Sequence, residues 1–409
     1  MRKVLIVILI LLIGKSHAQQ NIFSVADAID YALKNNASLG AAEYEVASRR
    51  ELRKTSFDLP KTEVSLLYGQ YNSYVDHDNN FTVTQSIPFS VFGSQGKLNR
   101  SLIVSAELKK VQTENELVFQ IKQIYNRLEY AYSLRKLLLQ QDSIFEGFYK
   151  SASLRYKAGE TKLLEQSTAE AQRTQAKIRL RENESDIAVL RSQLRSLLNT
   201  PAIPDIEDQE LTEISSGSSF DTALLSANPS LIYARQQIEV TKNEKKVQAA
   251  RFAPDFLVGF FSQTLIGTSD SETGAVANGS ERFTGFQVGV SIPLWFVPHQ
   301  GRARAAEYNT KAKESHYYAH GQQLRSQMEQ AIQEFHKNRN SLASFRDASL
   351  PNAELILKQS EASFRGGEIG YAEFLLGLRN AIDIREQYLQ TLHNYNQSII
   401  LIEFLSGNK

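Results

Sequence analysis

The sequence contains no cysteine and has almost no net charge. The lack of cysteine excludes disulfide bonds, thiolate metal sites, cysteine nucleophiles and an N-terminal cysteine that could carry a lipid. The chain has 46 basic and 45 acidic side chains, which give a formal net charge of +1. A protein that binds nucleic acid through its phosphates needs a basic surplus, so we expect no nucleic-acid partner.

The common catalytic and cofactor-binding motifs are also missing. The patterns typical of serine hydrolases, zinc proteases, dinucleotide-binding folds and phosphate-binding loops do not occur. We therefore expect no enzyme activity, no catalytic residue and no cofactor. His316 and His320 have the i, i+4 spacing of a helical metal site, but no further ligand completes a set, so a solvated helix face is favoured. Asp76, His77 and Asp78 are interpreted as an ordinary polar loop in preference to a weak cation site.

Only one long hydrophobic run is present, and it lies at the N-terminus. Positions 4–13 are all aliphatic, two basic residues precede them, and small residues stand at 16 and 18. This layout predicts a secretory signal peptide at 1–18, cleaved after Ala18. A membrane anchor is the alternative, but the run is too short to cross a bilayer as a helix. We expect the remaining chain, 19–409, to be soluble beyond the inner membrane or to insert as β-strands.

The remaining chain presents the same series of landmarks twice. Each series begins with a helical segment that ends at a proline. Two extended segments follow, the second ending in Ile-Pro, and then long helices interrupted by a glycine phrase. We predict two structural repeats, about 22–200 and 219–408, joined by an acidic linker at 201–218. Proline fixes φ and removes a hydrogen-bond donor, so it suits a change between helix and strand. Such junctions are expected at Pro60, Pro88, Pro254 and Pro293.

The four extended segments have the alternation of strands with one apolar face. They are expected at 62–71, 81–87, 255–264 and 283–292. In the last segment, Phe286, Val288, Val290 and Ile292 alternate with small or polar residues. Large apolar residues toward lipid and small or polar residues toward a lumen are typical of a membrane β-barrel. Two hairpins packed on a soluble core are the alternative. Four strands cannot close a barrel and open sheet edges are not tolerated in lipid, so the membrane interpretation requires oligomerisation.

The helical regions have a narrow apolar stripe. The stripe recurs every 3.5 residues on average, which is the pattern of a left-handed coiled coil. The region 97–154 contains no proline and only one glycine, Gly147, so it is expected to form one helix roughly 85 Å long. The stripe residues are Leu117, Ile121, Ile124, Leu128, Ala131 and Leu138 in the first repeat, and Leu378, Ala381, Tyr388, Leu392, Tyr395, Ile399 and Ile402 in the second.

The ordered set of these features resembles the TolC-like outer-membrane efflux protein family. The resemblance covers the chain after position 18 and rests on the duplicated layout, the Ile-Pro strand ends and three short phrases. These are Ala-Pro-Asp-Phe at 253–256, Tyr-Lys-Ala-Gly at 156–159 and Phe-Arg-Gly-Gly at 364–367. It implies an α+β membrane protein that forms a homotrimer. Each protomer would give four strands to a 12-stranded outer-membrane β-barrel, continuous with a long α-helical coiled-coil tunnel in the periplasm.

The resemblance also implies a function and partners. Members conduct substrates passively, together with a periplasmic adaptor and an inner-membrane pump, which we expect to be proton-driven. Metal cations are the favoured substrate, as in the metal-efflux branch, while drugs and other small molecules remain open. An outer-membrane component of a type I protein secretion system is the alternative in the same class. A periplasmic coiled-coil adaptor that never enters the membrane is the alternative from another class. Without a lipidated cysteine, anchoring falls to the contact of the barrel with outer-membrane lipid, where Trp295 and Phe296 suit an interfacial aromatic girdle.

In the family, the glycine phrases mark turns at the periplasmic tip, where partners dock. Here they place Gly159 and Gly367, preceded by Ala158 and Gly366, at the tips of two helical hairpins. Glycine suits such turns because they often need a positive φ.

A carboxylate follows each turn glycine by six residues: Glu165 and Glu373. The resemblance implies that an acid at the second position helps form a constriction, and a threefold ring of acids would favour cations. For Glu373, a role in the constriction and an ordinary solvated helix charge have equal weight. For Glu165, the ordinary solvated charge is favoured over a role in the constriction. Some relatives have a second acid one turn later, where this chain has Leu376, which speaks against a two-layer acidic gate.

Overall fold

The computed structural model describes residues 24–70, 74–201, 209–215, 220–270 and 272–408. The signal peptide predicted at 1–18 and parts of the linker predicted at 201–218 lie outside these ranges. The chain divides into two compact units. The hairpin unit takes its described residues from 24–40, 113–228 and 324–408, and the sheet unit takes its own from 41–112 and 229–323. No helix in the described ranges is both long and apolar enough to cross a membrane.

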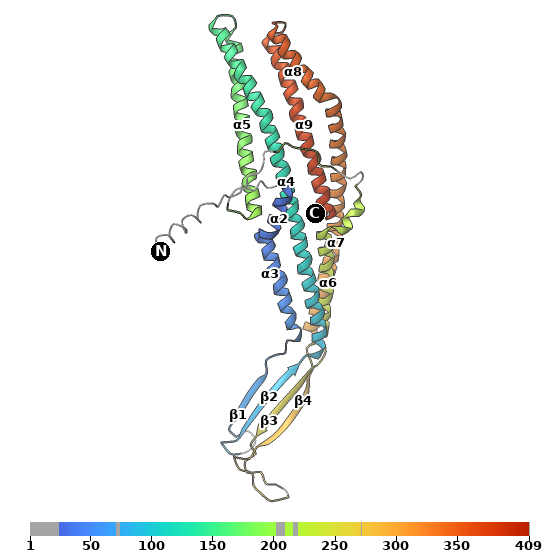
Figure 1. The fold of residues 1–409 in the computed structure, drawn as a ribbon. Helices are drawn as coiled ribbons and strands as arrows, with labels where there is room; N and C mark the ends of the chain where they lie inside the picture. Colours follow the sequence, from blue (N-terminus) through green and yellow to red (C-terminus); the bar gives the residue numbers. More distant parts are fainter. Residues whose placement is uncertain (1–23, 71–73, 202–208, 216–219, 271, 409) are drawn as a thin grey trace, which may run out of the picture. The chain divides into compact units, whose positions relative to one another are not determined.

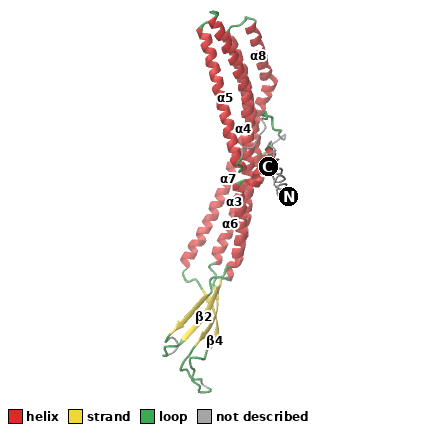
Figure 2. Ribbon diagram, turned by 60° about the vertical axis from the view of Figure 1, so that its left-hand side comes forward, coloured by secondary structure: helices red, strands yellow, loops and turns green. Residues whose placement is uncertain are grey.

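The sheet unit contains one antiparallel sheet of four strands in the order β1-β2-β3-β4 (Figure 1). Figure 2 shows the strands of this sheet in yellow. The strands are β1 (Glu63–Tyr68), β2 (Asn79–Ile87), β3 (Asp255–Gln263) and β4 (Phe283–Ser291). All four expected strands are therefore confirmed, with larger shifts of their ends in the first hairpin and a C-terminal end one residue earlier in each strand of the second. Strand β1 is shorter than expected because Gly69 takes a φ of 123° and its N–H donates to the carbonyl of Asp78 at 2.8 Å, which turns the chain.

Helices in the sheet unit lead into and out of these strands. Helix α3 (Ala37–Leu52) and the 3₁₀ turn η1 (Arg53–Phe57) precede β1, and α6 (Pro229–Ala250) precedes β3. The first part of α4 (Phe89–Lys157) follows β2, and the first part of α7 (Phe296–Ser344) follows β4. Each predicted junction proline lies between a helical segment and a strand: Pro60, Pro88, Pro254 and Pro293.

The hairpin unit is helical. It contains α2 (Val25–Asn35), the rest of α4, α5 (Leu163–Leu198), the 3₁₀ turn η2 (Thr222–Ala227), the rest of α7, α8 (Leu350–Arg365) and α9 (Tyr371–Ser406). Helices α4 and α5 form one hairpin, and α8 and α9 form the other. Within this unit the two hairpin turns lie at the same end (Figure 1).

The apolar stripes form the core of the hairpin unit. Every member of the first stripe is buried, and Ile121 and Leu128 lie against Ala28 of α2 and Leu194 of α5 in one cluster. In the second stripe all members are buried except Tyr388, which is half-buried. The 3.5-residue repeat therefore identifies the packed face of both helices correctly.

The two predicted repeats differ in one respect that the sequence pattern does not indicate. Helix α4 is continuous, whereas its counterpart is divided by a π-helical segment, Phe345–Ser349, between α7 and α8. Pro351 lies at the start of α8. Because proline lacks an N–H and its ring crowds the carbonyl four residues earlier, the helix must widen or bend at this point.

The described part of the linker packs on the hairpin unit. Leu211 is buried, and its N–H donates to Ser133 Oγ of α4 at 2.8 Å. The N–H of Ile214 donates to Asn396 Oδ1 of α9 at 3.0 Å, and Asn396 Nδ2 donates to the carbonyl of Thr212 at 2.7 Å. The sequence predicts only a connector here. The pairing of the buried Asn396 with the linker backbone is seen only in the structure.

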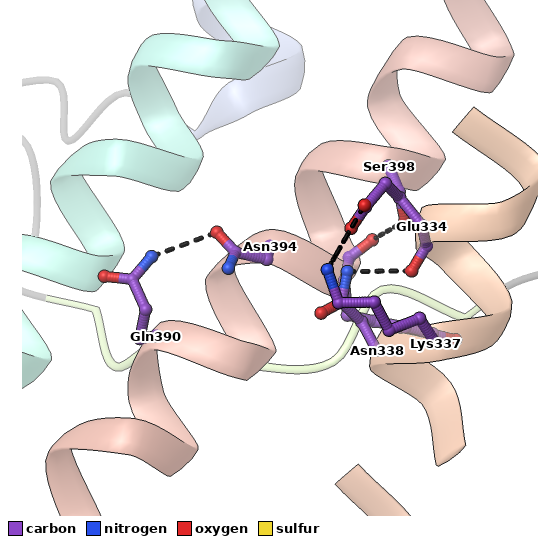
Figure 3. Close-up of polar contacts among 7 residues, drawn as sticks. Glu334, Lys337, Asn338, Gln390, Asn394 and Ser398 are labelled. Atoms are coloured by element: carbon purple, nitrogen blue, oxygen red, sulfur yellow. Dashed lines mark hydrogen bonds and ion pairs between the residues drawn. The ribbon is translucent and has the colours of Figure 1, made fainter. Parts of the chain in front are cut away.

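Several polar side chains on α7 and α9 form hydrogen bonds within their own helices (Figure 3). On α7, Asn338 is buried and its Nδ2 donates to the carbonyl of Glu334 at 2.8 Å. On α9, Ser398 is buried and its Oγ donates to the carbonyl of Tyr395 at 2.6 Å. These bonds allow polar residues to lie beside the apolar stripe without an unpaired group.

Candidate gate at the tips of the helical hairpins

The turn between α4 and α5 is closed by a Schellman motif. The N–H of Glu160 donates to the carbonyl of Arg155 at 2.9 Å, and the N–H of Gly159 donates to that of Tyr156 at 3.0 Å. Gly159 has a φ of 79°. This pair of bonds is the standard satisfaction of the last helical carbonyls, and it requires a left-handed residue at the glycine position.

The turn between α8 and α9 has the same bonds. The N–H of Glu368 donates to the carbonyl of Ser363 at 2.9 Å, and the N–H of Gly367 donates to that of Phe364 at 3.2 Å. Gly367 has a φ of 74°, whereas Gly366 has a φ of −74° and remains helical. The expected positive φ is therefore confirmed at Gly159 and Gly367. In the Gly366-Gly367 pair, only Gly367 takes the left-handed conformation.

Glu165 is held within the first hairpin. Its Oε1 accepts a hydrogen bond from Arg155 Nη1 at 3.2 Å, and Thr161 Oγ1 donates to its Oε2. It also lies in the first turn of α5, where the helix dipole favours a negative charge. These contacts match the interpretation of Glu165 as an ordinary structural charge.

Tyr371 brings the second hairpin next to this ion pair. Tyr371 is the first residue of α9 and lines a surface cavity of about 550 Å³ together with Arg155 and Glu165. Burial, and to a lesser degree the negative charge of Glu165, raise the pKa of the Tyr371 hydroxyl. The cavity therefore joins the two turns, and the sequence alone did not single out Tyr371.

Glu373 has a different environment. It lies in the first turn of α9 and is exposed, and no ion pair or hydrogen bond of its carboxylate is recorded within the described part of the chain. Leu376, one turn later, is also exposed, as are Leu163 and Leu164 on the first hairpin. Glu160, in the turn between α4 and α5, is likewise exposed and has no side-chain partner recorded among the described residues. The tips thus present two acids without a recorded partner beside exposed leucines.

An aromatic cluster behind the tip holds the two hairpins together. Phe148 of α4 lies 5.6 Å from Phe364 of α8 and 4.5 Å from Phe374 of α9, between ring centroids. Phe145 and Phe374 are almost fully buried in the same cluster. Burying such rings together stabilises the pairing of the hairpins. Phe364 and Phe374 flank the glycine phrase in the sequence, which is the signal that could have identified this cluster.

The polar positions that resembled metal sites have other partners. His320 Nε2 lies 2.8 Å from Ser230 Oγ, and His316 and His320 line a cavity of about 440 Å³ together with Lys109 and Lys313, whose charges disfavour a cation. In the predicted loop tip, Asp76 accepts a hydrogen bond from Gln70, and the buried Asp78 accepts one from Thr264. In the described ranges no group of three or more metal-ligating side chains occurs.

The sheet presents an exposed apolar face. The strand register places β3 residues Phe256, Val258 and Phe260 on the same face as their β4 partners. Phe286 of β4 is 86% exposed. The opposite face carries small and polar residues such as Gly259, Gln287 and Ser291. It also carries the larger apolar residues Leu67, Leu257, Phe261 and Phe283. The apolar face comprises Val64, Leu66, Tyr68, Phe81, Val83, Ile87, Phe256, Val258, Phe260, Phe286, Val288 and Val290, interrupted by Asn79, Gln85, Ser262 and Thr284.

Comparison with known proteins supports one fold. No protein-family model and no curated protein matches the sequence. Solved structures match over most of the chain. The outer-membrane channel OprN has a TM-score of 0.80 and 15% identity, covering 94% of this chain and 90% of its own. The CmeC outer-membrane channel of Campylobacter jejuni has a TM-score of 0.77 and 14% identity, covering 94% and 85%. The outer-membrane protein VceC of Vibrio cholerae has a TM-score of 0.75 and 15% identity, covering 94% and 96%. The chain therefore has the fold of TolC-like outer-membrane channel proteins.

Proposed function

We propose that this protein is the outer-membrane channel of a tripartite efflux system. It would conduct substrates passively across the periplasm and the outer membrane, in concert with a periplasmic adaptor and a proton-driven inner-membrane pump. The observation that carries the proposal is the exposed apolar face of the sheet, in a chain whose fold is that of outer-membrane channels. An exposed apolar face of this size marks a surface that contacts lipid or protein.

The open sheet supports assembly into a trimer. Strands β1 and β4 are the edges of the sheet, so each has a row of backbone groups without a partner strand among the residues that the structure describes. In lipid such groups must be paired, and closure into a barrel is the one arrangement of strands that pairs them all. Three copies with four strands each would form a 12-stranded barrel, while a periplasmic adaptor with no membrane contact would leave the apolar face in water.

The hairpin tips support the assignment of partners. Leu163, Leu164 and Leu376 are exposed beside the two turns, and exposed leucines suit contact with another protein. The adaptor would bind at Ala158–Gly159 and Gly366–Gly367. Three copies of Glu373 around a threefold axis would favour cations, which agrees with metal cations as the first substrate class to test. A type I secretion channel remains the alternative assignment for the same fold.

Single-channel recording in planar bilayers tests the proposal. The detergent-purified protein is expected to migrate as a trimer and to produce discrete conductance steps. Glu373→Gln is expected to lower the cation-to-anion permeability ratio roughly twofold or more, because it neutralises a ring of three charges. The matched control is Glu354→Gln, an exposed acid on α8 away from the turn.

Two results would contradict the proposal at different levels. A stable monomer without conductance would remove the channel function. Conducting trimers in which Glu373→Gln and Glu354→Gln both leave selectivity unchanged would remove the role of Glu373 while keeping the channel.

A further inference from the structure

A basic cavity lies in the sheet unit where η1 packs beside the first turns of α4. Its volume is about 490 Å³. It is lined by four cationic side chains, Arg53, Lys54, Lys97 and Arg100, and by no acidic one. A net positive charge of this kind attracts an anion.

Most of this positive charge has no acidic partner among the described residues. Lys54 contacts Glu51 three residues earlier. For Arg53, Lys97 and Arg100 no ion pair is recorded among the residues that the structure describes, and all three side chains are exposed. The cavity therefore has three cations available to an external partner.

The cavity is held open by the local structure. The buried Asn99 of α4 fixes η1, because its Nδ2 donates to the carbonyl of Leu52 and to Ser56 Oγ, each at 3.1 Å. Gly93 and Gly96 line the wall formed by α4. A Cβ atom at Gly93 would meet nothing within 4 Å, so the missing side chain leaves real space.

A row of aromatic rings connects the cavity to the apolar face of the sheet. Phe57 lies 5.1 Å from Phe92 between ring centroids, Phe92 lies 6.2 Å from Phe89, and Phe89 lies 5.7 Å from Phe256. Phe256 belongs to the apolar face, at the start of β3. Phe57 is 77% exposed at the edge of the cavity.

This arrangement matches the layers of a membrane surface. Aromatic side chains prefer the boundary between hydrocarbon and headgroups, and basic side chains just beyond it attract anionic headgroups. Arginine and lysine both bind phosphate through charge-assisted hydrogen bonds. A phosphate in the cavity would allow an acyl chain to follow the aromatic row onto the apolar face.

We propose that this cavity binds the headgroup phosphate of an anionic phospholipid in the periplasmic leaflet of the outer membrane. The proposal rests on the proposed function, because it requires the sheet to span that membrane. It would give the chain a specific lipid anchor at the junction of strand and helix, in a protein without a cysteine for lipidation.

Retention of phosphatidylglycerol by the detergent-purified trimer tests the proposal. The protein is equilibrated with mixed micelles of phosphatidylglycerol and phosphatidylcholine, washed, and analysed by native mass spectrometry. We expect wild type to retain phosphatidylglycerol selectively, and the triple variant Arg53→Gln, Lys97→Gln, Arg100→Gln to bind it roughly tenfold more weakly because charge-assisted contacts are lost. The matched control is Lys313→Gln, Arg325→Gln, Lys358→Gln, which removes the same charge from exposed positions elsewhere.

A second variant separates a built cavity from general attraction of charges. Gly93→Leu keeps every charge, places a good helix former in α4 and fills the space beside the glycine. It is expected to weaken phosphatidylglycerol retention by a similar factor. Equal retention by wild type, the triple variant and Gly93→Leu would overturn the proposal.

Two further measurements are needed. One shows whether the bound phosphate belongs to a lipid or is a free anion, and the other separates failure of the lipid site from failure of the proposed channel function. Displacement of the bound lipid by millimolar inorganic phosphate would overturn the lipid assignment and indicate a free anion site. Conductance is recorded on the same samples. Conducting trimers without selective lipid retention would remove this inference alone, whereas the absence of both trimers and conductance would remove the proposed function.

Discussion

Glu129 lies on α4 with most of its side chain buried, and burial raises the pKa of its carboxyl to about 7 from 4.5. Below pH 4.5 the carboxyl is neutral in the folded and unfolded chains, so burial carries no electrostatic cost. Between about pH 4.5 and 7 the carboxyl ionises in the unfolded chain while it stays mostly neutral in the folded chain, so folding stability falls over this range and levels off above pH 7. This residue makes the hairpin unit more stable in mildly acidic than in alkaline solution.

The first prediction is that Glu129→Gln removes this pH dependence. Glutamine keeps the shape and cannot ionise, so the variant should be more stable than wild type at pH 8 by up to about 3 kcal/mol, and nearly equal to it at about pH 4. Thermal unfolding of the detergent-purified protein between about pH 4 and 8 measures the difference. Glu184→Gln, at an exposed position on α5, serves as the control. A melting temperature of Glu129→Gln that falls with pH as steeply as that of wild type would show that Glu129 is not the group responsible.

At the scale of elements, both hairpins depend on one left-handed residue in each turn. Gly367 has a φ of 74°, and the adjacent Gly366 has a φ of −74°. The same Schellman bonds recur at the ends of α5 and α9, where Asn199 and Gly407 take the left-handed conformation. Local chemistry therefore determines where each long helix stops.

The second prediction is that Gly367→Ala destabilises the second hairpin while Gly366→Ala does not. Alanine in the left-handed region costs about 1–2 kcal/mol, whereas alanine at a helical position is favoured over glycine. At Gly366 the nearest atom to an added Cβ is the carbonyl oxygen of Ala362 at 3.4 Å, which is an ordinary contact. Hydrogen exchange in α8 and α9 measures the effect. Equal exchange in the two variants would show that the left-handed turn does not limit the stability of the hairpin.

The elements predicted best from the sequence are those with local signals. The strand alternation, the junction prolines and the turn glycines depend on neighbouring residues, and the positions of the strands and turns follow from them. Other contacts have no local signal. Residues distant in the sequence meet in the aromatic cluster of Phe148 and Phe374 and in the pairing of Asn396 with the linker. The contact of Glu165 with Arg155 is closer in the sequence but spans the hairpin turn. Single-sequence patterns do not contain that information. The π-helical segment was missed because one proline, Pro351, outweighs an otherwise regular helical pattern.

At the scale of the whole molecule, the protomer is incomplete as the membrane structure that we propose. Its sheet has an apolar face and, among the described residues, two edges without a partner strand, β1 and β4. The backbone groups on those edges need partners once the sheet is in lipid, and another copy of the same chain supplies them in the proposed trimer. The sheet thus favours assembly for the same reason that it cannot enter the membrane alone.

The last prediction is that assembly protects the edge strands. In the trimer, the outward amides of β1 and β4 should pair with neighbouring protomers and exchange with deuterium as slowly as those of β2 and β3, which are paired on both sides in the protomer. Hydrogen exchange of the conducting trimer, followed by mass spectrometry of peptides from each strand, measures this protection. Peptides from the loop between β3 and β4 provide the control for fast exchange. If β1 and β4 exchange rapidly in conducting trimers while β2 and β3 remain protected, the edges are not joined between protomers and the barrel must be closed in another way.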